Sequence, residues 1–227
     1  MINNRLVYNS TIISFILLLL VTFIPAMDID FSKLFYDSEN GFIYRNNIIV
    51  KLFFVIIPIL TKILLLITSV YLLYLIIKYK SFSKIILSWS FYLIIATAIG
   101  PGLLVNSILK ENFGRARPIQ IVNFNGAKNF TRAFSITNEC VHNCSFSSGH
   151  AAMGYSFTSF AYIFPYIFFT RIYSVALCFG SLVGLSRILM GGHFLSDVLA
   201  SCFIILIVNH LVYLCWKKLG ILILDKE

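Results

Sequence analysis

Residues 195–216 read LSDVLASCFIILIVNHLVYLCW, an apolar run in which the only acidic or strongly basic residue is Asp197. An α-helix crosses the hydrocarbon core of a bilayer in about 20 residues, so this run has the length of one membrane span. The preceding residues, SRILMGGHF at 186–194, contain Arg187 and His193. The sequence therefore predicts a membrane helix whose start carries polar, titratable side chains.

The composition of the whole chain supports a membrane protein. Of its 227 residues, 59% are hydrophobic and 12% charged, whereas soluble domains are about 45–50% apolar and about 25% charged. This excludes a water-soluble globule, a disordered chain, a collagen and a small disulfide-rich domain. The formal net charge of +9 favours anionic lipid headgroups or phosphate-containing substrates, and no nucleic acid partner is expected.

Six apolar runs predict an all-α, six-helix transmembrane bundle that forms one domain over residues 1–227. The runs cover residues 7–27, 52–77, 85–108, 151–169, 173–190 and 195–216. Helices are expected because the sequence has no extended alternation typical of a barrel and backbone groups in lipid must be paired internally. We expect kinks at Pro58, Pro101 and Pro165. The first run lacks a clear A-x-A cleavage site, so we expect a retained helix and not a signal peptide.

An even number of spans places both chain ends on one side of the membrane. Basic residues divide almost evenly between the two sides, but the short loop 78–84 and residues 217–218 favour a cytoplasmic location for the ends. The polar segments 28–47 and 109–148 would then lie outside. Polar segments as long as the second are usually functional or disordered.

Two cysteines, Cys140 and Cys144, frame the sequence CVHNC in the outer segment. In an oxidising compartment they can form a local disulfide. A metal site that includes His142 is the alternative, but no fourth ligand lies nearby in the sequence, so we expect no metal. The other three cysteines, Cys178, Cys202 and Cys215, fall in apolar runs, where buried small side chains are the usual interpretation.

Three polar clusters lie at the outer ends of the predicted spans. They are KENFGRARP at 110–118, FSSGH at 146–150 and SRILMGGHFLSD at 186–197. Lys110 is a point charge, while Arg117 and Arg187 are planar groups that can donate two hydrogen bonds to one oxyanion. Alone, each is most simply explained as a side chain reaching the headgroups.

The second and third clusters add groups suited to catalysis. Ser148 and Gly149 come directly before an apolar helix, whose first N–H groups and dipole favour an anion, although simple helix capping is the ordinary explanation. His193 and Asp197 are four residues apart and share a helix face. Asp197 is therefore expected to accept a hydrogen bond from one nitrogen of His193 and leave the other as a nucleophile. His150 is the second titratable group, and the joint occurrence on one membrane face favours an enzyme.

The pattern K-x6-R-P, S-G-H and S-R-x5-H-x3-D, spread over residues 109–197, resembles the type 2 phosphatidic acid phosphatase (PAP2) superfamily. The resemblance implies a six-helix core, no cofactor and metal-independent phosphate ester hydrolysis. By this resemblance His193 attacks phosphorus and forms a phosphohistidine, Asp197 orients it, and His150 protonates the leaving oxygen. The expected phosphate-binding groups are Lys110, Arg117, Arg187 and the backbone of Ser148 and Gly149. One departure is Ser147, where the family usually has proline.

A narrower resemblance involves DIDFSKLFYD at 28–37, GRARP at 114–118 and the CVHNCSF lead into the second cluster. These stretches are similar to bacterial lipid A phosphatases, which remove the 1- or 4′-phosphate. This implies a lipid A or phospholipid substrate and a multi-pass enzyme of the bacterial inner membrane whose active site faces the periplasm. Undecaprenyl pyrophosphate and phosphatidylglycerophosphate phosphatases are the alternatives. An anion transporter is a distant one, because the polar groups lie at one face and not at the midplane.

Overall fold

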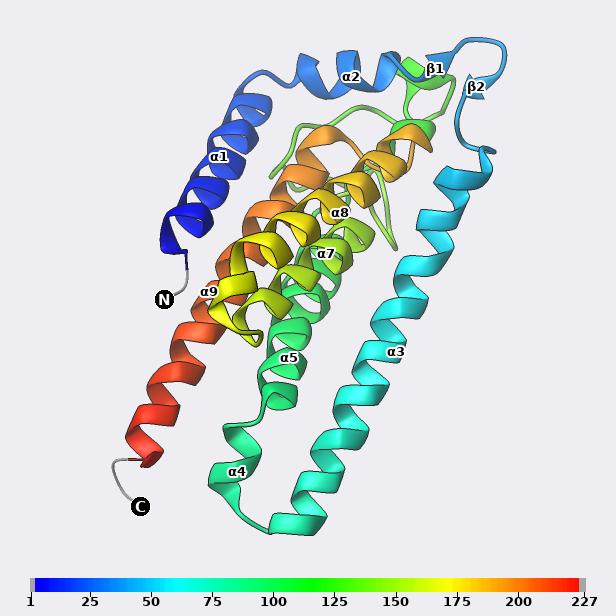
Figure 1. Ribbon diagram of the computed structural model, residues 1–227. Helices are drawn as coiled ribbons and strands as arrows, with labels where there is room; N and C mark the ends of the chain where they lie inside the picture. Colours follow the sequence, from blue (N-terminus) through cyan, green and yellow to red (C-terminus); the bar gives the residue numbers. More distant parts are fainter. Residues whose placement is uncertain (1–2, 225–227) are drawn as a thin grey trace.

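A computed structural model describes the backbone of residues 3–224 and the side chains of residues 3–220. In this part of the chain, five helices are long and apolar enough to cross a membrane. They are α1 (Asn4–Phe23), α3 (Ile48–Tyr79), the continuous segment Trp89–Asn112, the segment Tyr166–Leu189 and α9 (Leu195–Leu224). Figure 1 shows them side by side in one elongated bundle. The predicted all-α membrane bundle is confirmed.

The predicted span at 151–169 is not one continuous helix, so the described residues contain five long apolar helices and the predicted count of six is not confirmed. The chain here forms α7 (Gly149–Ser156), a 3₁₀ helix at Phe157–Tyr162 and a second short one at Tyr166–Phe168. Pro165 stands between the two 3₁₀ helices, where its missing N–H prevents a regular helix. The chain still passes back through the bundle here, so both ends of the described chain lie away from α2 (Figure 1).

Two other prolines lie inside helices that continue past them. Pro58 lies within α3, which has no break between Ile48 and Tyr79. Pro101 lies in a π-helix, Ala98–Leu109, that joins α5 (Trp89–Thr97) to α6 (Lys110–Asn112). Its carbonyl accepts a hydrogen bond of 2.7 Å from the Asn106 side chain. A polar side chain one turn later thus adds a hydrogen bond to the backbone of this segment.

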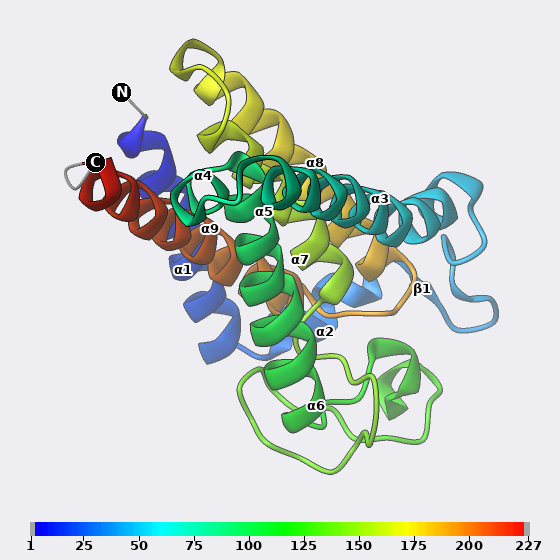
Figure 2. The same cartoon turned by 90° about the horizontal axis from the view of Figure 1, so that it is seen from below.

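One end of the bundle is covered by irregular segments. Helix α2 (Ala26–Lys33) leads into a hairpin of β1 (Tyr36–Asp37) and β2 (Gly41–Phe42). The long segment 113–148 contains only the short 3₁₀ helices Pro118–Gln120 and Val122–Phe124. In the view of Figure 2 this segment lies beside α6 and next to α2. An aromatic cluster that contains Phe42, Phe124 and Phe194 packs beneath it. We call the covering layer formed by α2, the hairpin of β1 and β2, and the segment 113–148 the cap.

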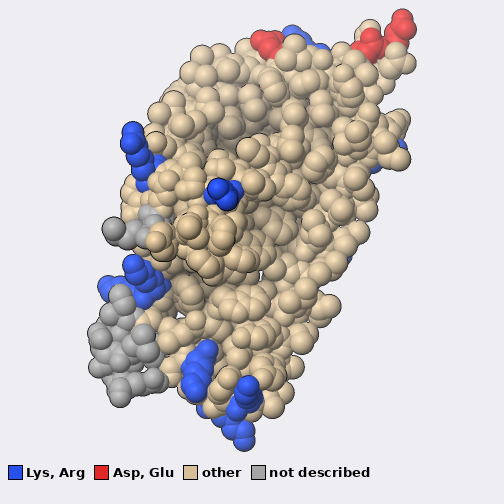
Figure 3. All heavy atoms as spheres, in the orientation of Figure 1, with Lys and Arg blue, Asp and Glu red and all other residues tan. Residues whose placement is uncertain are grey.

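Acidic side chains lie at one end of the bundle, whereas basic side chains are spread over it. In the face shown in Figure 3, the acidic side chains gather at the end that carries the cap, and basic side chains occur there, on the flank and at the opposite end. Lys78 and Lys80 lie at the end of α3, Lys84 in α4 (Phe82–Ile86) and Lys217 near the end of α9.

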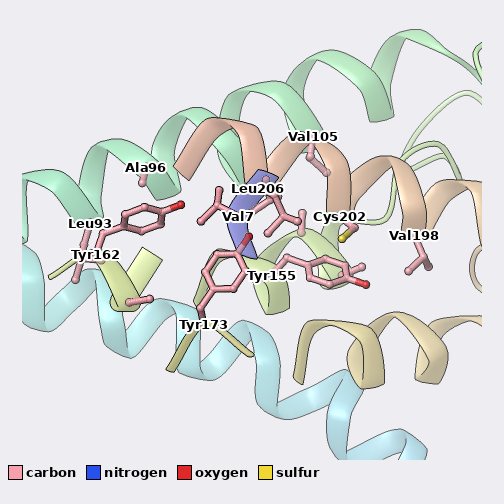
Figure 4. Close-up of a cluster of buried hydrophobic side chains, with 14 of the residues drawn as sticks. Val7, Leu93, Ala96, Val105, Tyr155, Tyr162, Tyr173, Val198, Cys202 and Leu206 are labelled. Atoms are coloured by element: carbon pink, nitrogen blue, oxygen red, sulfur yellow. The ribbon is translucent and has the colours of Figure 1, made fainter. Parts of the chain in front are cut away.

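The core lies between the helices and extends along the bundle below the cap. Figure 4 shows side chains from α1, α5, the π-helix, α7, α8 (Phe169–Leu189) and α9 packing together, among them Tyr155, Tyr173 and Cys202. Helix α7 contacts α3, α8, α9 and the π-helix, so the protein and not lipid encloses it. Cys202 is buried as expected, but Cys178 and Cys215 are exposed on the outer surface, contrary to the prediction.

Candidate active site

The three polar clusters meet at the capped end of the bundle. Helix α7 packs against both α8 and α9, which brings the start of α7 close to the end of α8 and the start of α9. The charges of Arg187, His193 and Lys110 all act on His150. The charges of Arg117 and Arg187 act on Lys110 in turn. The structure thus assembles the predicted cations and both imidazoles into one site.

His193 lies in the turn between α8 and α9 and is oriented by a backbone carbonyl. Its Nδ1 is 2.8 Å from the carbonyl oxygen of Ser145. A carbonyl only accepts hydrogen bonds, so Nδ1 carries the proton and Nε2 is the free, nucleophilic nitrogen of the neutral ring. The side chain is 1% exposed, and burial lowers the pKa of His193 to about 4. The ring is therefore neutral near pH 7.

Asp197 lies close to His193 but is not its hydrogen-bond acceptor. The distance from His193 Nδ1 to Asp197 Oδ2 is 3.6 Å, longer than a hydrogen bond, so the predicted direct bond is replaced by the bond to Ser145. Asp197 Oδ2 instead accepts hydrogen bonds from the Ser145 hydroxyl at 2.5 Å and the Phe194 N–H at 2.8 Å. The carboxylate fixes Ser145, and its charge favours a cationic imidazole ring.

Arg115 and Asp28 belong to the site although the sequence analysis assigned neither of them a role. Arg115 is 1% exposed, and its guanidinium donates to Asp197 Oδ1 at 2.6 Å and to Asp28 Oδ2 at 2.8 Å. Its Nε donates to the Thr131 carbonyl at 2.8 Å. Because a buried charge is costly unless paired, the two carboxylates and the arginine depend on one another. Two features of the sequence could have indicated these residues: Arg115 is the first arginine of GRARP, and Asp28 is the first acidic residue after the first apolar run.

Arg187 presents hydrogen-bond donors that have no strong acceptor. It lies in the last turn of α8 and is 4% exposed. Its Nε is buried without a partner in the described part of the chain, and Nη1 contacts the Met190 sulfur at 3.2 Å, a weak acceptor. A Cβ at Gly192 would stand 2.5 Å from Arg187 Nη2. Glycine at 192 therefore leaves room for the guanidinium.

His150 provides the second buried nitrogen of the site without a hydrogen-bond partner. Its Nε2 is buried and has no hydrogen-bond partner among the described residues. Buried polar atoms are nearly always paired. The charge of Arg187 acts on His150, so their two unpaired nitrogens belong to one site. These nitrogens therefore indicate that an anion or a polar ligand completes this site.

Phe54 of α3 forms part of the wall beside these two groups. Its ring stacks on that of His150 with centroids 4.8 Å apart and planes 21° from parallel. The Cζ atom of Arg187 lies 4.5 Å from the centre of the same ring. The sequence analysis missed this residue, because a phenylalanine inside an apolar run looks like any other lipid-facing side chain.

Arg117 is held by the disulfide loop. Its Nε and Nη2 both donate to the backbone carbonyl of Asn143, at 3.2 Å and 2.7 Å. Asn143 lies inside the loop that a disulfide between Cys140 and Cys144 closes. Burial lowers the pKa of Arg117, although the group stays charged at neutral pH. The loop thereby fixes one cation of the site.

The start of α7 differs in part from the expected phosphate cradle. The Ser148 hydroxyl caps the helix by accepting from the Ala151 N–H at 3.4 Å. The Ser148 N–H donates to the Asp197 carbonyl at 3.2 Å, so it is not available to a phosphate as predicted. Gly149 follows at the first position of α7, where any Cβ would collide with the Asn106 side chain.

Comparison with known proteins agrees with this geometry. The model of the PAP2 superfamily matches residues 89–221. The lipid A 4′-phosphatase of Francisella tularensis subsp. novicida is 34% identical over 211 residues, which cover 86% of this chain and 88% of that relative. The chain belongs to the PAP2 superfamily. The predicted family and the predicted phosphatase class of enzyme are confirmed.

Other PAP2 relatives match a shorter part of the chain. The lipid A 4′-phosphatase of Rhizobium etli is 43% identical over 104 residues, which cover 45% of this chain and 40% of that relative. The lipid A 1-phosphatase of the same organism is 34% identical over 116 residues, 50% of this chain and 44% of the relative. No solved structure matches this PAP2 protein.

Proposed function

We propose that this PAP2 protein is a lipid A phosphatase that removes the 4′-phosphate. The observation that carries this proposal is a neutral, oriented His193 beside Arg187 and His150, each of which has one buried nitrogen without a partner among the described residues. The name of the relative with 86% coverage of this chain favours lipid A and the 4′ position. Removal of the 1-phosphate is the nearest variant, supported by a relative that covers 50% of the chain.

In the first step, Nε2 of His193 attacks phosphorus and the bond between phosphorus and the sugar oxygen breaks. Burial and the neighbouring cations lower the pKa of His150 to about 3 in the free protein, and the negative charge of the bound phosphate stabilises its protonated form. The leaving oxygen takes this proton from His150, and a phosphohistidine remains. Lys110, Arg117 and Arg187 stabilise the charge on the phosphoryl oxygens in the transition state. The Ser145 carbonyl and the charge of Asp197 stabilise the protonated Nδ1 side of the ring, which gains positive character as Nε2 forms its bond.

In the second step, water attacks the phosphohistidine. His150, which lost its proton in the first step, takes one from the water, and the bond between phosphorus and Nε2 breaks. Inorganic phosphate leaves, and His193 returns to its neutral form. Each histidine thus ends the cycle in its starting protonation state.

The reaction is proposed to need no metal ion. Three cationic side chains, Lys110, Arg117 and Arg187, supply the charge stabilisation that a metal supplies in other phosphatases. Among the described side chains of residues 3–220, no group of three or more His, Cys, Asp or Glu is suited to hold a metal. Phosphate release should therefore be unchanged by EDTA, and strict dependence on an added divalent cation would contradict the mechanism.

We propose that the protein lies in the bacterial inner membrane with its active site facing the periplasm. The relatives described above are bacterial. The basic ends of α3 and α9 lie opposite the cap (Figure 3), and basic residues favour the cytoplasmic side. The disulfide at the capped end suits an oxidising compartment.

The direct test is a phosphate-release panel with purified protein in detergent. The substrates are lipid A, undecaprenyl pyrophosphate, phosphatidylglycerophosphate and phosphatidic acid, with mass spectrometry of the lipid product. We expect lipid A to lose its 4′-phosphate and the variant His193→Ala to be inactive. Preferential hydrolysis of another lipid would overturn the proposed substrate, and wild-type turnover by His193→Ala would overturn the proposed nucleophile.

A further inference from the structure

Asp28 joins the cap to the active site. It lies in α2, outside residues 89–221 that the PAP2 model matches. Its side chain is 1% exposed. Oδ1 accepts from the Ser196 N–H at 2.8 Å, and Oδ2 accepts from the Ser196 hydroxyl at 2.5 Å and from Arg115 at 2.8 Å. Every bond of this carboxylate therefore leads to the first turn of α9 or to the arginine that binds Asp197.

Arg115 is occupied on all sides by these contacts. Nη2 binds Asp28, Nη1 binds Asp197 and the Ser196 hydroxyl, and Nε binds the Thr131 carbonyl. Arg115 differs in this from Arg187, whose Nε has no hydrogen-bond partner among the described residues. Asp28 thus directs Arg115 toward Asp197 and away from the phosphate site. Asp197 keeps Oδ1 on Arg115 and Oδ2 on Ser145, the residue whose carbonyl orients His193.

The charges of the group matter as much as its geometry. Two carboxylates share one guanidinium, so the group carries one net negative charge beside His193 when both are ionised. Burial raises the pKa of Asp28, whereas the charge of Arg115 favours its ionised form. Phosphorylation of a ring that keeps its Nδ1 proton makes that ring cationic, which a neighbouring negative charge favours. Without the charge of Asp28, Arg115 and Asp197 would offset each other and leave His193 without this support.

We propose that Asp28 is a positioning residue of the active site, which acts on His193 through Arg115, Asp197 and Ser145. The proposal rests on the proposed role of His193 as the nucleophile. It predicts that the first segment of the chain, which lies outside the region matched by the PAP2 model, contributes to turnover and not only to stability.

The first experiment compares Asp28→Asn with Asp30→Asn. Asparagine keeps the shape of the side chain and removes its charge. Asp30 is the matched control on the same helix, because its side chain is 67% exposed and pairs only with Lys33 among the described residues. We expect Asp28→Asn to lower kcat about 10- to 100-fold, as is typical when the partner of a functional group is removed, with KM changed less than about threefold. Asp30→Asn should match the wild type.

A double-mutant cycle separates positioning from docking of α2. If Asp28 acts through Arg115, the losses of kcat in Asp28→Asn and Arg115→Gln will not multiply in the double variant. A purely structural role predicts a lower temperature of unfolding but a wild-type kcat for each folded molecule. Either that result or losses that multiply would overturn the proposal.

The pH profile gives a further readout. The charged groups that act on His193 are Asp197, Arg187, Arg117 and His150, and Asp28 reaches it through Arg115. Burial raises the pKa of Asp28, so its negative charge is fullest near pH 7 and fades toward the acid limb. Asp28→Asn should therefore lower kcat most near neutral pH and least at the acid end of the profile. A loss of kcat of the same size at every pH would contradict the charge component of the proposal.

Failure of the proposal can be told apart from failure of the proposed function. If wild-type protein hydrolyses none of the lipids, the substrate assignment fails, and p-nitrophenyl phosphate still reports the ratio of variant to wild-type turnover. Orthovanadate, a mimic of five-coordinate phosphorus, needs no turnover at all. It should raise the unfolding temperature of the wild type and of Asp30→Asn more than that of Asp28→Asn. Equal stabilisation of all three proteins would overturn the role of Asp28.

Discussion

The ring of Phe54 stacks on the ring of His150 at a centroid distance of 4.8 Å, while the guanidinium of Arg187 lies over the same phenylalanine at 4.5 Å. One side chain from α3 therefore contacts both the proposed proton donor and a proposed phosphate ligand. An aromatic face attracts a cation, so Phe54 also reduces the repulsion between Arg187 and a protonated His150. The site is shaped by a helix that carries none of the family motifs.

Replacing Phe54 with leucine should therefore slow proton transfer to the leaving group. We expect kcat for a lipid phosphate to fall about tenfold, within the range of general acid catalysis, and to fall less for p-nitrophenyl phosphate, whose leaving group needs no proton. Phe54→Trp should restore most of the activity because the aromatic face is retained. Phe53→Leu is the matched control, since Phe53 packs on Phe179 instead. Equal losses for both substrates would refute a role for Phe54 in proton transfer.

The pKa of His193 predicts how activity depends on pH. Burial lowers it from an ordinary value of 6.5 to about 4, and only the neutral ring can attack phosphorus. The acid limb of kcat/KM should therefore lie near pH 4 and not near pH 6.5, as measured over about pH 4 to pH 8. The control variant His142→Gln alters an exposed histidine and should leave the profile unchanged.

The same shift has a consequence for stability. Between the unfolded value of 6.5 and the folded value of about 4, the unfolded chain binds a proton at this histidine and the folded chain does not. The free energy of unfolding should therefore fall as the pH is lowered through this window. A His193→Gln variant should show a weaker dependence on pH there in denaturant titrations. An unchanged slope would contradict the buried, neutral state of the ring.

Opening the disulfide should weaken phosphate binding. The Cys140–Cys144 bond closes the loop whose Asn143 carbonyl holds two donors of Arg117. We expect the double variant Cys140→Ser, Cys144→Ser to raise KM several-fold, by a change typical of a weakened charged hydrogen bond. Reducing agent should produce the same effect in the wild type and none in the double variant. Cys178→Ser serves as the control, because this exposed cysteine is free.

Adding a methyl group at Gly192 should displace Arg187. Its Cβ would stand 2.5 Å from Arg187 Nη2, closer than atoms in a packed protein tolerate. We expect Gly192→Ala to lower kcat/KM about 10- to 100-fold, because small misplacement of a catalytic group is costly. Gly102→Ala is the control, since its Cβ would meet only the Thr97 carbonyl at 3.4 Å. A similar activity in both variants would argue against Arg187 as a phosphate ligand.

Much of the site could be predicted because its chemistry depends on side chains at fixed spacings. Short motifs contain Lys110, Arg117, His150 and His193. A helical bundle brings together the outer ends of the helices that carry these motifs. The acceptor of the His193 proton could not be predicted, because it is the backbone carbonyl of Ser145. A main-chain oxygen belongs to every residue and leaves no trace in the sequence.

The interruption of the helix at 151–169 could not be predicted for a related reason. Hydropathy measures whether a segment is apolar but not what surrounds it. The segment that contains Ala151 and Ala152 is enclosed by other helices and not by lipid. Its apolar character therefore reflects burial inside the protein, and its helix does not have to be long enough to cross a bilayer. Pro165 then interrupts the remainder of the run.

The contact between Asp28 and Ser196 joins positions 168 residues apart. During synthesis, α2 emerges and reaches its side of the membrane long before α9 is made. The carboxylate of Asp28 remains in water or among headgroups until α9 brings Ser196 and Asp197 to it. The catalytic centre therefore forms only once α9 is in place, and a chain arrested before α9 cannot hydrolyse phosphate esters by this mechanism.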